Sequence, residues 1–210
     1  AGFYERAGVL RDVFQNHLLQ LVTLTTMEPP SALNGKTLRD EKVKVLQAIR
    51  PLRPEDAVLG QYEGYRQERG VAEDSHTPTY AALRLYVDNW RWQGVPFYVR
   101  SGKSLAETST VITLQFQRVP HLLFLGGAEP QPNRLCLFIQ PDEGISISFD
   151  TKVPGAGMRS QPVNMTFRYE ETYGDRATLT VIAGENHMIN RRRDEVIRQT
   201  VSFFKSVFED

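Results

Sequence analysis

The sequence predicts an α+β fold in which a large, mostly antiparallel sheet carries helices packed on one face. Apolar residues recur with helical spacing near the start of the chain and again near its end. Between these regions, the sequence after Pro54 consists of short runs that alternate apolar and polar residues. The connections between these runs are too short for crossover helices, so neighbouring strands are expected to pair antiparallel.

Two helices are expected before the sheet. The first runs from about residue 4 to residue 26 and ends at Glu28-Pro29-Pro30, because proline lacks the backbone donor and restricts the residue before it. Its apolar positions with helical spacing are Val9, Leu10, Val13, Phe14, Leu18, Leu21 and Val22. The second runs from about residue 38 to residue 49 and stops at Pro51. Its expected buried stripe is Val43, Leu46 and Ile49.

Eight strands and a closing helix are expected after the first two helices. The period-two alternation is clearest where Ile145, Ile147 and Phe149 are separated by polar residues. The expected strands are 57–62, 80–89, 96–101, 110–118, 134–140, 145–153, 163–170 and 178–183, followed by a helix over 194–208. The charged, glycine-punctuated segment 63–78 is predicted to be a mobile loop.

Composition excludes several classes of partner. Of 210 residues, 25 are Lys or Arg and 25 are Asp or Glu, so no net field attracts nucleic acid or an anionic membrane. No apolar run reaches the roughly 20 residues that span a bilayer, and no signal peptide opens the sequence. The single cysteine, Cys136, excludes an internal disulfide and fits a reducing compartment, so we expect a cytoplasmic protein. The histidines lack metal-ligand spacing, so no metal is expected.

A cluster of polar residues interrupts the apolar pattern of the first helix. Asp12, Gln15, Asn16 and His17 fall within six positions. Histidine has an unperturbed pKa of roughly 6.5, so His17 could accept a proton as a general base. The alternative is that His17 only belongs to the polar edge of an amphipathic helix.

A second polar cluster follows the expected strand 96–101. Gly102 lets the backbone approach a ligand closely, and Lys103 offers a compact positive charge that suits a phosphate group. Arg100 could form a bidentate pair with a phosphate or a carboxylate. The alternative here is a solvated strand end. Taken together, the two clusters supply a base and a phosphate anchor.

Both clusters belong to a longer series of sequence blocks. The blocks are Tyr4, Gly8, Leu10-Arg11-Asp12, Gln15-Asn16-His17, Met27-Glu28-Pro29-Pro30, Arg39-Asp40-Glu41-Lys42-Val43-Lys44-Val45-Leu46, Leu59-Gly60-Gln61-Tyr62, Asn89, Arg91-Trp92, Gly94-Val95-Pro96-Phe97, Arg100 and Gly102-Lys103. In their order and spacing, with agreement continuing to about Tyr173, they resemble the C-terminal part of the glucose-6-phosphate dehydrogenase family.

The resemblance implies an oxidoreductase reaction and a role for four residues. The reaction oxidises glucose 6-phosphate at C1 to 6-phosphogluconolactone with NADP⁺ as hydride acceptor, the first step of the oxidative pentose phosphate pathway. His17 matches the general base that takes the C1 hydroxyl proton. The positions that match substrate contacts are Asp12, Lys103 and Gln140. On an ideal α-helix Asp12 and His17 would lie about 140° apart, and so would flank a ligand.

The resemblance also bears on cofactor and assembly. Arg100 matches a position through which some members hold a second, structural NADP⁺. Its companions there are usually basic, whereas this sequence has Thr108, Thr113 and Phe138, so we do not expect that second site. The family pattern implies a homodimer with contacts through the sheet.

Two departures from the family limit these expectations. The part before Ala1 that would carry the dinucleotide-binding domain and the carboxylate orienting the histidine is absent, and no Gly-x-Gly-x-x-Gly follows a strand. We therefore expect a piece of a longer chain, assigned over 1–210 to the C-terminal domain, that binds NADP little and is inactive alone. The alternative is a non-catalytic assembly or regulatory module that associates with a full-length dehydrogenase. The tail also departs from the family, which leaves the fold of 177–190 uncertain.

Overall fold

The computed structural model describes residues 2–118, 131–157 and 159–174. These residues form two compact units, one up to residue 105 and one from residue 106 onward. The expected strand 178–183, the closing helix 194–208 and the uncertain segment 177–190 lie outside the described residues. No helix within the described ranges is long and apolar enough to cross a bilayer.

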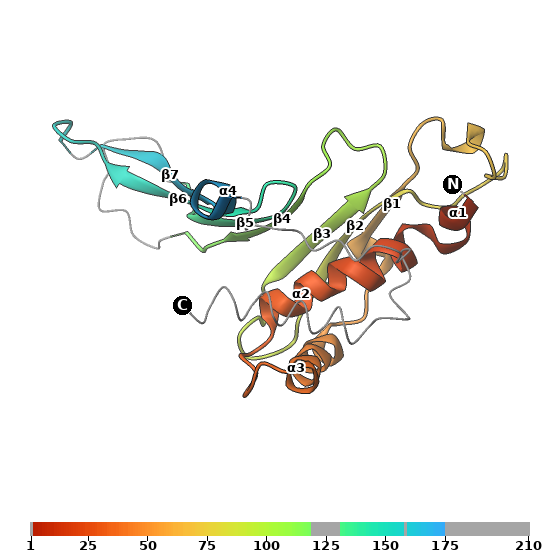
Figure 1. The fold of residues 1–210 in the computed structure, drawn as a ribbon, viewed down its shortest axis with the longest axis horizontal. Helices are drawn as coiled ribbons and strands as arrows, with labels where there is room; N and C mark the ends of the chain where they lie inside the picture. The colour runs from red at the N-terminus through yellow and green to blue at the C-terminus, as the bar shows by residue number, and fades with distance from the viewer. Residues whose placement is uncertain (1, 119–130, 158, 175–210) are drawn as a thin grey trace. The chain divides into compact units, whose positions relative to one another are not determined.

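The first unit combines a three-stranded antiparallel sheet with a helical layer (Figure 1). The strands, in the spatial order β1-β2-β3, are β1 (Ala57–Gly60), β2 (Tyr80–Tyr86) and β3 (Pro96–Gly102). The helices are α1 (Gly2–Val9), η1 (Leu10–Leu18), α2 (Leu19–Thr26) and α3 (Gly35–Ala48). Two short 3₁₀ turns, η2 (Pro54–Asp56) and η3 (Tyr65–Gln67), lie in the connections.

Among the described residues, the helices cover one face of this sheet and leave the other face open. Successive strand residues point to opposite faces, and Ala81 and Leu85 of β2 are 0% and 6% exposed. Their core partners from the helices and the loop are Tyr4, Val9, Phe14 and Tyr65. On the opposite face Tyr98 is 76% exposed. The expected α+β class, with helices on one face of an antiparallel sheet, is confirmed.

The predicted first helix is divided into three pieces. Gly8 has φ +66° and ψ 169°, a left-handed conformation that a residue with a side chain would adopt only with strain. From Leu10 to Leu18 the helix is a π-helix, in which backbone bonds join residues five apart, as from the Leu19 N–H to the Phe14 carbonyl. Val9 and Phe14, also five apart, are both buried. Leu10, one of the apolar positions of the helical pattern, is 38% exposed in this register.

Helix α3 buries a different face from the one predicted. It begins at the N-cap Asn34, whose Oδ1 accepts from the Lys36 and Thr37 N–H groups. Val45 is 3% exposed, whereas the predicted Val43 and Leu46 are 40% and 38% exposed. The α2 side of α3 includes Lys42, whose Nζ donates to Gln20 Oε1 at 3.0 Å. The buried face of α3 is therefore centred on Val45, one position away from the predicted stripe.

The segment 63–78 is a loop, as predicted, but its contacts anchor it to α1. Tyr65 is 2% exposed and donates its hydroxyl proton to Glu5 Oε2 at 2.8 Å. Ser75 Oγ donates to the same carboxylate at 2.9 Å, and Thr77 Oγ1 donates to the Glu5 carbonyl. The sequence pattern indicated mobility because it shows the charged residues and not these long-range bonds.

The second unit is a four-stranded antiparallel meander. Its strands, adjacent in chain order, are β4 (Thr110–Gln115), β5 (Arg134–Gln140), β6 (Gly144–Lys152) and β7 (Ser160–Arg168), and a short helix α4 (Tyr169–Tyr173) follows. The period-two strand around Ile147 is β6, which pairs with β7 through Ile147 and Met165. The described strands are therefore distributed over two sheets, one in each unit.

Candidate functional site

The first polar cluster lies on the π-helix η1. Asp12 and His17 are five residues apart, and in a π-helix residues with this spacing are joined across one turn. The two side chains therefore start from the same side of the helix. The expectation that they lie about 140° apart assumed an ideal α-helix and is wrong. Asp12 is half-buried and His17 is exposed.

The second polar cluster lies where β3 ends. Gly102 pairs with Tyr80 of β2, and a Cβ at Gly102 would lie 2.7 Å from Tyr80 Cδ2 and 3.2 Å from the Thr79 carbonyl oxygen. Glycine is therefore required by close packing at this point. Lys103 follows it, with an exposed side chain and a backbone N–H that donates to the Thr79 carbonyl at 2.9 Å.

The dipeptide Pro78-Thr79 joins the two clusters through its backbone. The Pro78 carbonyl accepts from the N–H of Val9, at the entrance to η1, at 3.2 Å. The Thr79 carbonyl accepts from the Lys103 N–H and, at 3.5 Å, from the Tyr4 hydroxyl. Thr79 is fully buried, and its Oγ1 accepts from the Tyr62 N–H at 2.9 Å. The entrance to η1 and the end of β3 are thus attached to adjacent carbonyl groups.

Tyr4 is a shared neighbour of Asp12 and Lys103. The Lys103 ammonium lies 5.2 Å from the centroid of the Tyr4 ring, within the range of a cation–π interaction. Burial, followed by the negative charge of Asp12, raises the pKa of Tyr4 to about 12. The hydroxyl therefore stays protonated near neutral pH, and the structure brings the carboxylate and the ammonium to the same aromatic side chain.

This arrangement has the parts needed to bind a phosphorylated polyol. A carboxylate accepts hydrogen bonds from hydroxyl groups, and an exposed ammonium attracts a phosphate. The exposed imidazole of His17, on the same side of η1 as Asp12, is available to a ligand as a base.

Two predicted residues belong to other parts of the fold. Arg100 is exposed on the open face of β3, opposite the helices, and its cross-strand neighbour is Ala82. Gln140 is exposed at the end of β5, in the second unit, where it pairs with Thr110. Asp12, His17 and Lys103 all belong to the first unit, in which the Lys103 ammonium lies over the Tyr4 ring.

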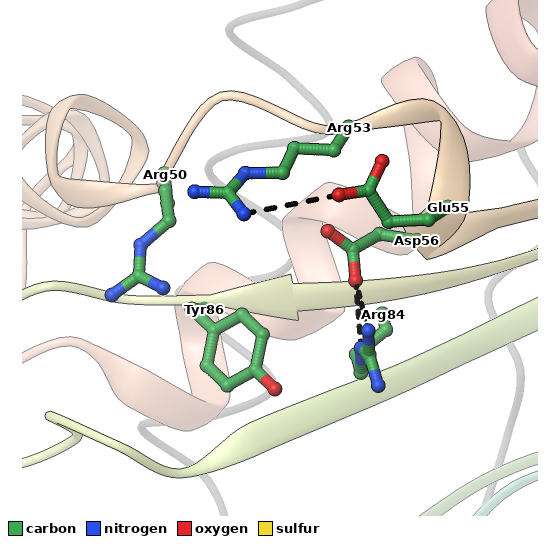
Figure 2. A pocket seen from close by; sticks show the side chains of 6 residues that line it. All are labelled: Arg50, Arg53, Glu55, Asp56, Arg84 and Tyr86. Atoms are coloured by element: carbon green, nitrogen blue, oxygen red, sulfur yellow. Dashed lines mark hydrogen bonds and ion pairs between the residues drawn. The ribbon is translucent and has the colours of Figure 1, made fainter.

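A pocket on the open face of the first sheet has a different character (Figure 2). It has a volume of about 260 Å³ and is lined by Arg50, Arg53, Glu55, Asp56, Arg84 and Tyr86. Its arginines already face carboxylates: Arg84 pairs with Asp56 at 2.6 Å, Arg53 with Glu55 at 3.8 Å and Arg50 with Asp88 at 2.8 Å. Paired guanidinium groups leave little net attraction for an anion, so this pocket is not a phosphate site.

Sequence reasoning missed the roles of Pro78, Thr79 and the Tyr4 ring. Any residue type offers a backbone carbonyl, so the sequence does not show which carbonyl groups make these contacts. Tyr4 was noted only as one of the positions that match the family.

The structure also explains the blocks Met27-Glu28-Pro29-Pro30 and Arg91-Trp92. Arg91 donates two hydrogen bonds to the Glu28 carboxylate, and Trp92 Nε1 donates to the Thr26 carbonyl at 3.0 Å, so these two blocks fix the end of α2. Across the described ranges, no three His, Cys, Asp or Glu residues are grouped to hold a metal.

Comparisons with known proteins agree with the geometry. The family described as "Glucose-6-phosphate dehydrogenase, C-terminal domain" matches residues 1–203. The glucose-6-phosphate 1-dehydrogenase of Aggregatibacter actinomycetemcomitans is 48% identical over 187 residues, which cover 82% of this chain and 37% of that protein. The enzyme of Bacillus subtilis is 43% identical over 182 residues, covering 80% of this chain and 37% of that protein.

Solved structures show the same relationship. A crystal structure of glucose-6-phosphate 1-dehydrogenase from Mycobacterium avium has a TM-score of 0.74 at 42% identity, covering 80% of this chain and 36% of that one. A glucose-6-phosphate dehydrogenase in complex with its substrate glucose-6-phosphate has a TM-score of 0.76 at 39% identity, covering 82% and 37%. The chain thus spans little more than a third of the length of these relatives. It belongs to the glucose-6-phosphate dehydrogenase family and corresponds to the C-terminal domain of those enzymes.

Proposed function

We propose that this chain forms the substrate-binding part of a glucose-6-phosphate dehydrogenase active site. The observation that carries the proposal is the contact of the Lys103 ammonium with the Tyr4 ring of α1, which directly precedes the element η1 that bears Asp12 and His17. A related solved structure holds glucose-6-phosphate as its substrate. The substrate needs a base, hydroxyl acceptors and a phosphate anchor, and these residues supply all three.

Each residue has a role that follows from its chemistry. His17 takes the proton of the C1 hydroxyl, because an alcohol releases hydride easily only while its proton is leaving. Asp12 accepts hydrogen bonds from sugar hydroxyls and so orients the ring. Lys103 contributes its charge near the phosphate group. Gln140 stays a candidate substrate contact on the resemblance alone. NADP⁺, when bound, supplies the hydride acceptor.

The residues around Arg100 do not fit a second NADP⁺. On the open face of the first sheet Arg84 is already paired with Asp56, and the direct cross-strand neighbour of Arg100 is Ala82. A dinucleotide phosphate needs several converging donors, which the described part of this face does not offer. Arg100 remains a candidate contact only, and we propose that NADP is bound mainly by a domain outside this chain.

We also propose that the chain, as one C-terminal domain over 1–210, assembles as a homodimer through its sheets in the cytoplasm. Partly exposed apolar side chains on the second sheet support the dimer. They are Val111, Ile147, Met165 and Phe167. The balanced charge and the single cysteine support the compartment.

The proposal is tested by following NADP⁺ reduction with glucose 6-phosphate. The chain alone should give no turnover above background, and addition of a nucleotide-binding half from a relative should restore it. Restoration should be lost with His17→Asn, which keeps a polar side chain but removes the base. Robust turnover by the chain alone, or restoration that survives His17→Asn, would contradict the proposal.

A non-catalytic assembly module is the competing function. It predicts that the chain binds a dehydrogenase without binding the sugar phosphate. The exposed apolar residues of the second sheet are compatible with it. Full restoration of turnover through His17 would exclude it.

A further inference from the structure

We infer that Tyr4 is a positioning residue of the substrate site: its ring holds the Lys103 ammonium beside Asp12, where it meets the phosphate group of the substrate. The inference rests on the proposed function, since it assigns a partner to Lys103 in that site. It adds a residue that touches no reacting atom and acts through Lys103.

The first argument is the placement of the ammonium over a rigid ring. The Lys103 Nζ lies 5.2 Å from the Tyr4 centroid, whereas an exposed lysine on a flexible four-carbon stem would otherwise sample many positions. Tyr4 is 8% exposed and packs in the core with Val9 and Phe14, so the ring itself is held in place. The ring therefore restricts the lysine before any ligand binds, which lowers the entropy lost on binding.

The second argument is a shared anchor. The carbonyl of Thr79 accepts from the Lys103 N–H at 2.9 Å and from the Tyr4 hydroxyl at 3.5 Å. The backbone of Lys103 and the hydroxyl of Tyr4 are thus hydrogen-bonded to the same carbonyl oxygen, which belongs to a fully buried residue. The bond from the Tyr4 hydroxyl is the longer and weaker of the two, and the ring is also held by its core packing, so loss of the hydroxyl should leave the ring in place.

The third argument concerns charge. A carboxylate paired directly with Lys103 would cancel its positive charge, whereas an aromatic ring attracts the ammonium without neutralising it. Lys103 remains exposed, so the side of the ammonium away from the ring is open to a phosphate. Burial, followed by the negative charge of Asp12, raises the pKa of Tyr4, so the charge of Asp12 acts on the same side chain that the ammonium contacts.

The test compares Tyr4→Phe and Tyr4→Leu by calorimetric titration with glucose 6-phosphate. Tyr4→Phe keeps the ring and should bind like the wild type. Tyr4→Leu keeps an apolar core residue without the ring and should bind about two- to fivefold more weakly. In a Lys103→Ala background the Tyr4→Leu change should cause no further loss, because the ring then has no ammonium to hold.

A merely structural role predicts a different pattern. Losses from Tyr4→Leu and Lys103→Ala that simply add would overturn the inference, as would a Tyr4→Leu affinity equal to the wild type. Should Tyr4→Leu fail to fold, Tyr4→Phe still decides: a loss as large as that of Lys103→Ala would show that the ring is not the platform.

A ligand-free measurement separates this inference from the proposed function. The ε-methylene proton resonances of Lys103 should be shifted upfield by the ring current in the wild type and Tyr4→Phe, and should return to ordinary values in Tyr4→Leu. Unshifted wild-type resonances would overturn the inference. If wild type shows the shift but gives no heat with glucose 6-phosphate, the proposed function fails and the use of the ammonium as a substrate anchor fails with it.

Discussion

Thr79 contributes more to the site through its backbone than through its side chain. Its carbonyl receives the Lys103 N–H and the Tyr4 hydroxyl, and its own N–H donates to the Gly60 carbonyl at 2.9 Å. The neighbouring carbonyl of Pro78 receives the Val9 N–H. At the residue scale, the site therefore depends on how closely the chain packs around this dipeptide.

Substitution of Gly102 by alanine tests that packing. A Cβ at this position would lie 2.7 Å from Tyr80 Cδ2 and 3.2 Å from the Thr79 carbonyl oxygen, so Gly102→Ala should destabilise by about 1–3 kcal/mol through overpacking. The control is Gly60→Ala, whose Cβ would meet Tyr80 at an ordinary 3.7 Å and should cost much less. Urea unfolding measures both, and equal costs would contradict the packing argument.

Glu5 gives the first unit a predictable dependence on pH. The hydroxyl of Ser75, followed by that of Tyr65, donates to the Glu5 carboxylate and lowers its pKa below the ordinary value of 4.5. A folded-state pKa below the unfolded one contributes stability that is present above about pH 4.5 and is lost as the pH falls through the lower folded value.

Glu5→Gln should therefore differ from wild type most near neutral pH, and the difference should shrink below about pH 4.5. The measurement is the free energy of unfolding in urea between pH 7 and pH 3. Glu73→Gln, an exposed residue of the same loop, controls for the change in net charge. Parallel pH profiles for wild type and Glu5→Gln would show that these hydrogen bonds do not favour the charged carboxylate.

Individual site residues were predictable only through resemblance. Periodicity showed that Asp12 and His17 are out of place in an apolar stripe, but their roles and that of Lys103 came from the matching sequence blocks. Thr79 had no such signal, because any residue type offers a backbone carbonyl. Tyr4 was recognisable as part of a matching sequence block, but its role was not. A contact between residues 4 and 103 cannot be predicted from sequence spacing.

At the scale of elements, the π-helix η1 is the feature that most affects the site. Its register places Asp12 and His17 on one side and buries Val9 with Phe14. A regular α-helix would place Leu10 and Phe14 together in the buried stripe, four residues apart. These two residues therefore distinguish the two registers.

Truncation of each residue measures the register directly. Phe14 is 4% exposed, so Phe14→Ala should cost about 3–5 kcal/mol, whereas Leu10→Ala, at a position 38% exposed, should cost about 1 kcal/mol or less. Chemical unfolding of the two variants gives both values. Similar costs for Phe14→Ala and Leu10→Ala would support an α-helical register and contradict the common side for Asp12 and His17.

Most element positions followed from the sequence, whereas the face that each helix buries did not. The prediction of a strand over 134–140 coincides with β5, and the others differ from the observed strands mainly at their ends. The alternation of apolar and polar residues and the turn residues between strands are local features of the sequence, so the positions of strands can be predicted from it. The buried face of η1 depends on a π-register, which a period of 3.6 residues does not contain, and that of α3 is centred on Val45, one position from the predicted stripe.

At the scale of the whole molecule, the chain carries one part of an active site. Its acidic and basic residues balance, so an anionic substrate must be attracted by a local cation, and Lys103, held over the Tyr4 ring, is the candidate. Gln140 belongs to a different unit, which the sequence did not separate from the first because the strand pattern runs through both. The matched part covers only 37% of the relative from Aggregatibacter actinomycetemcomitans, and we propose that the remainder of such a protein supplies the nucleotide site.

The central claim, that this chain binds glucose 6-phosphate through Lys103, is tested most directly by calorimetric titration. The wild type should give measurable heat, and Lys103→Ala should bind at least about tenfold more weakly, the loss expected for a hydrogen bond to a charged group. Lys36→Ala, which removes an exposed lysine paired with Asp40, should leave the affinity unchanged. Absence of heat with the wild type, or equal affinities for wild type and Lys103→Ala, would contradict the account.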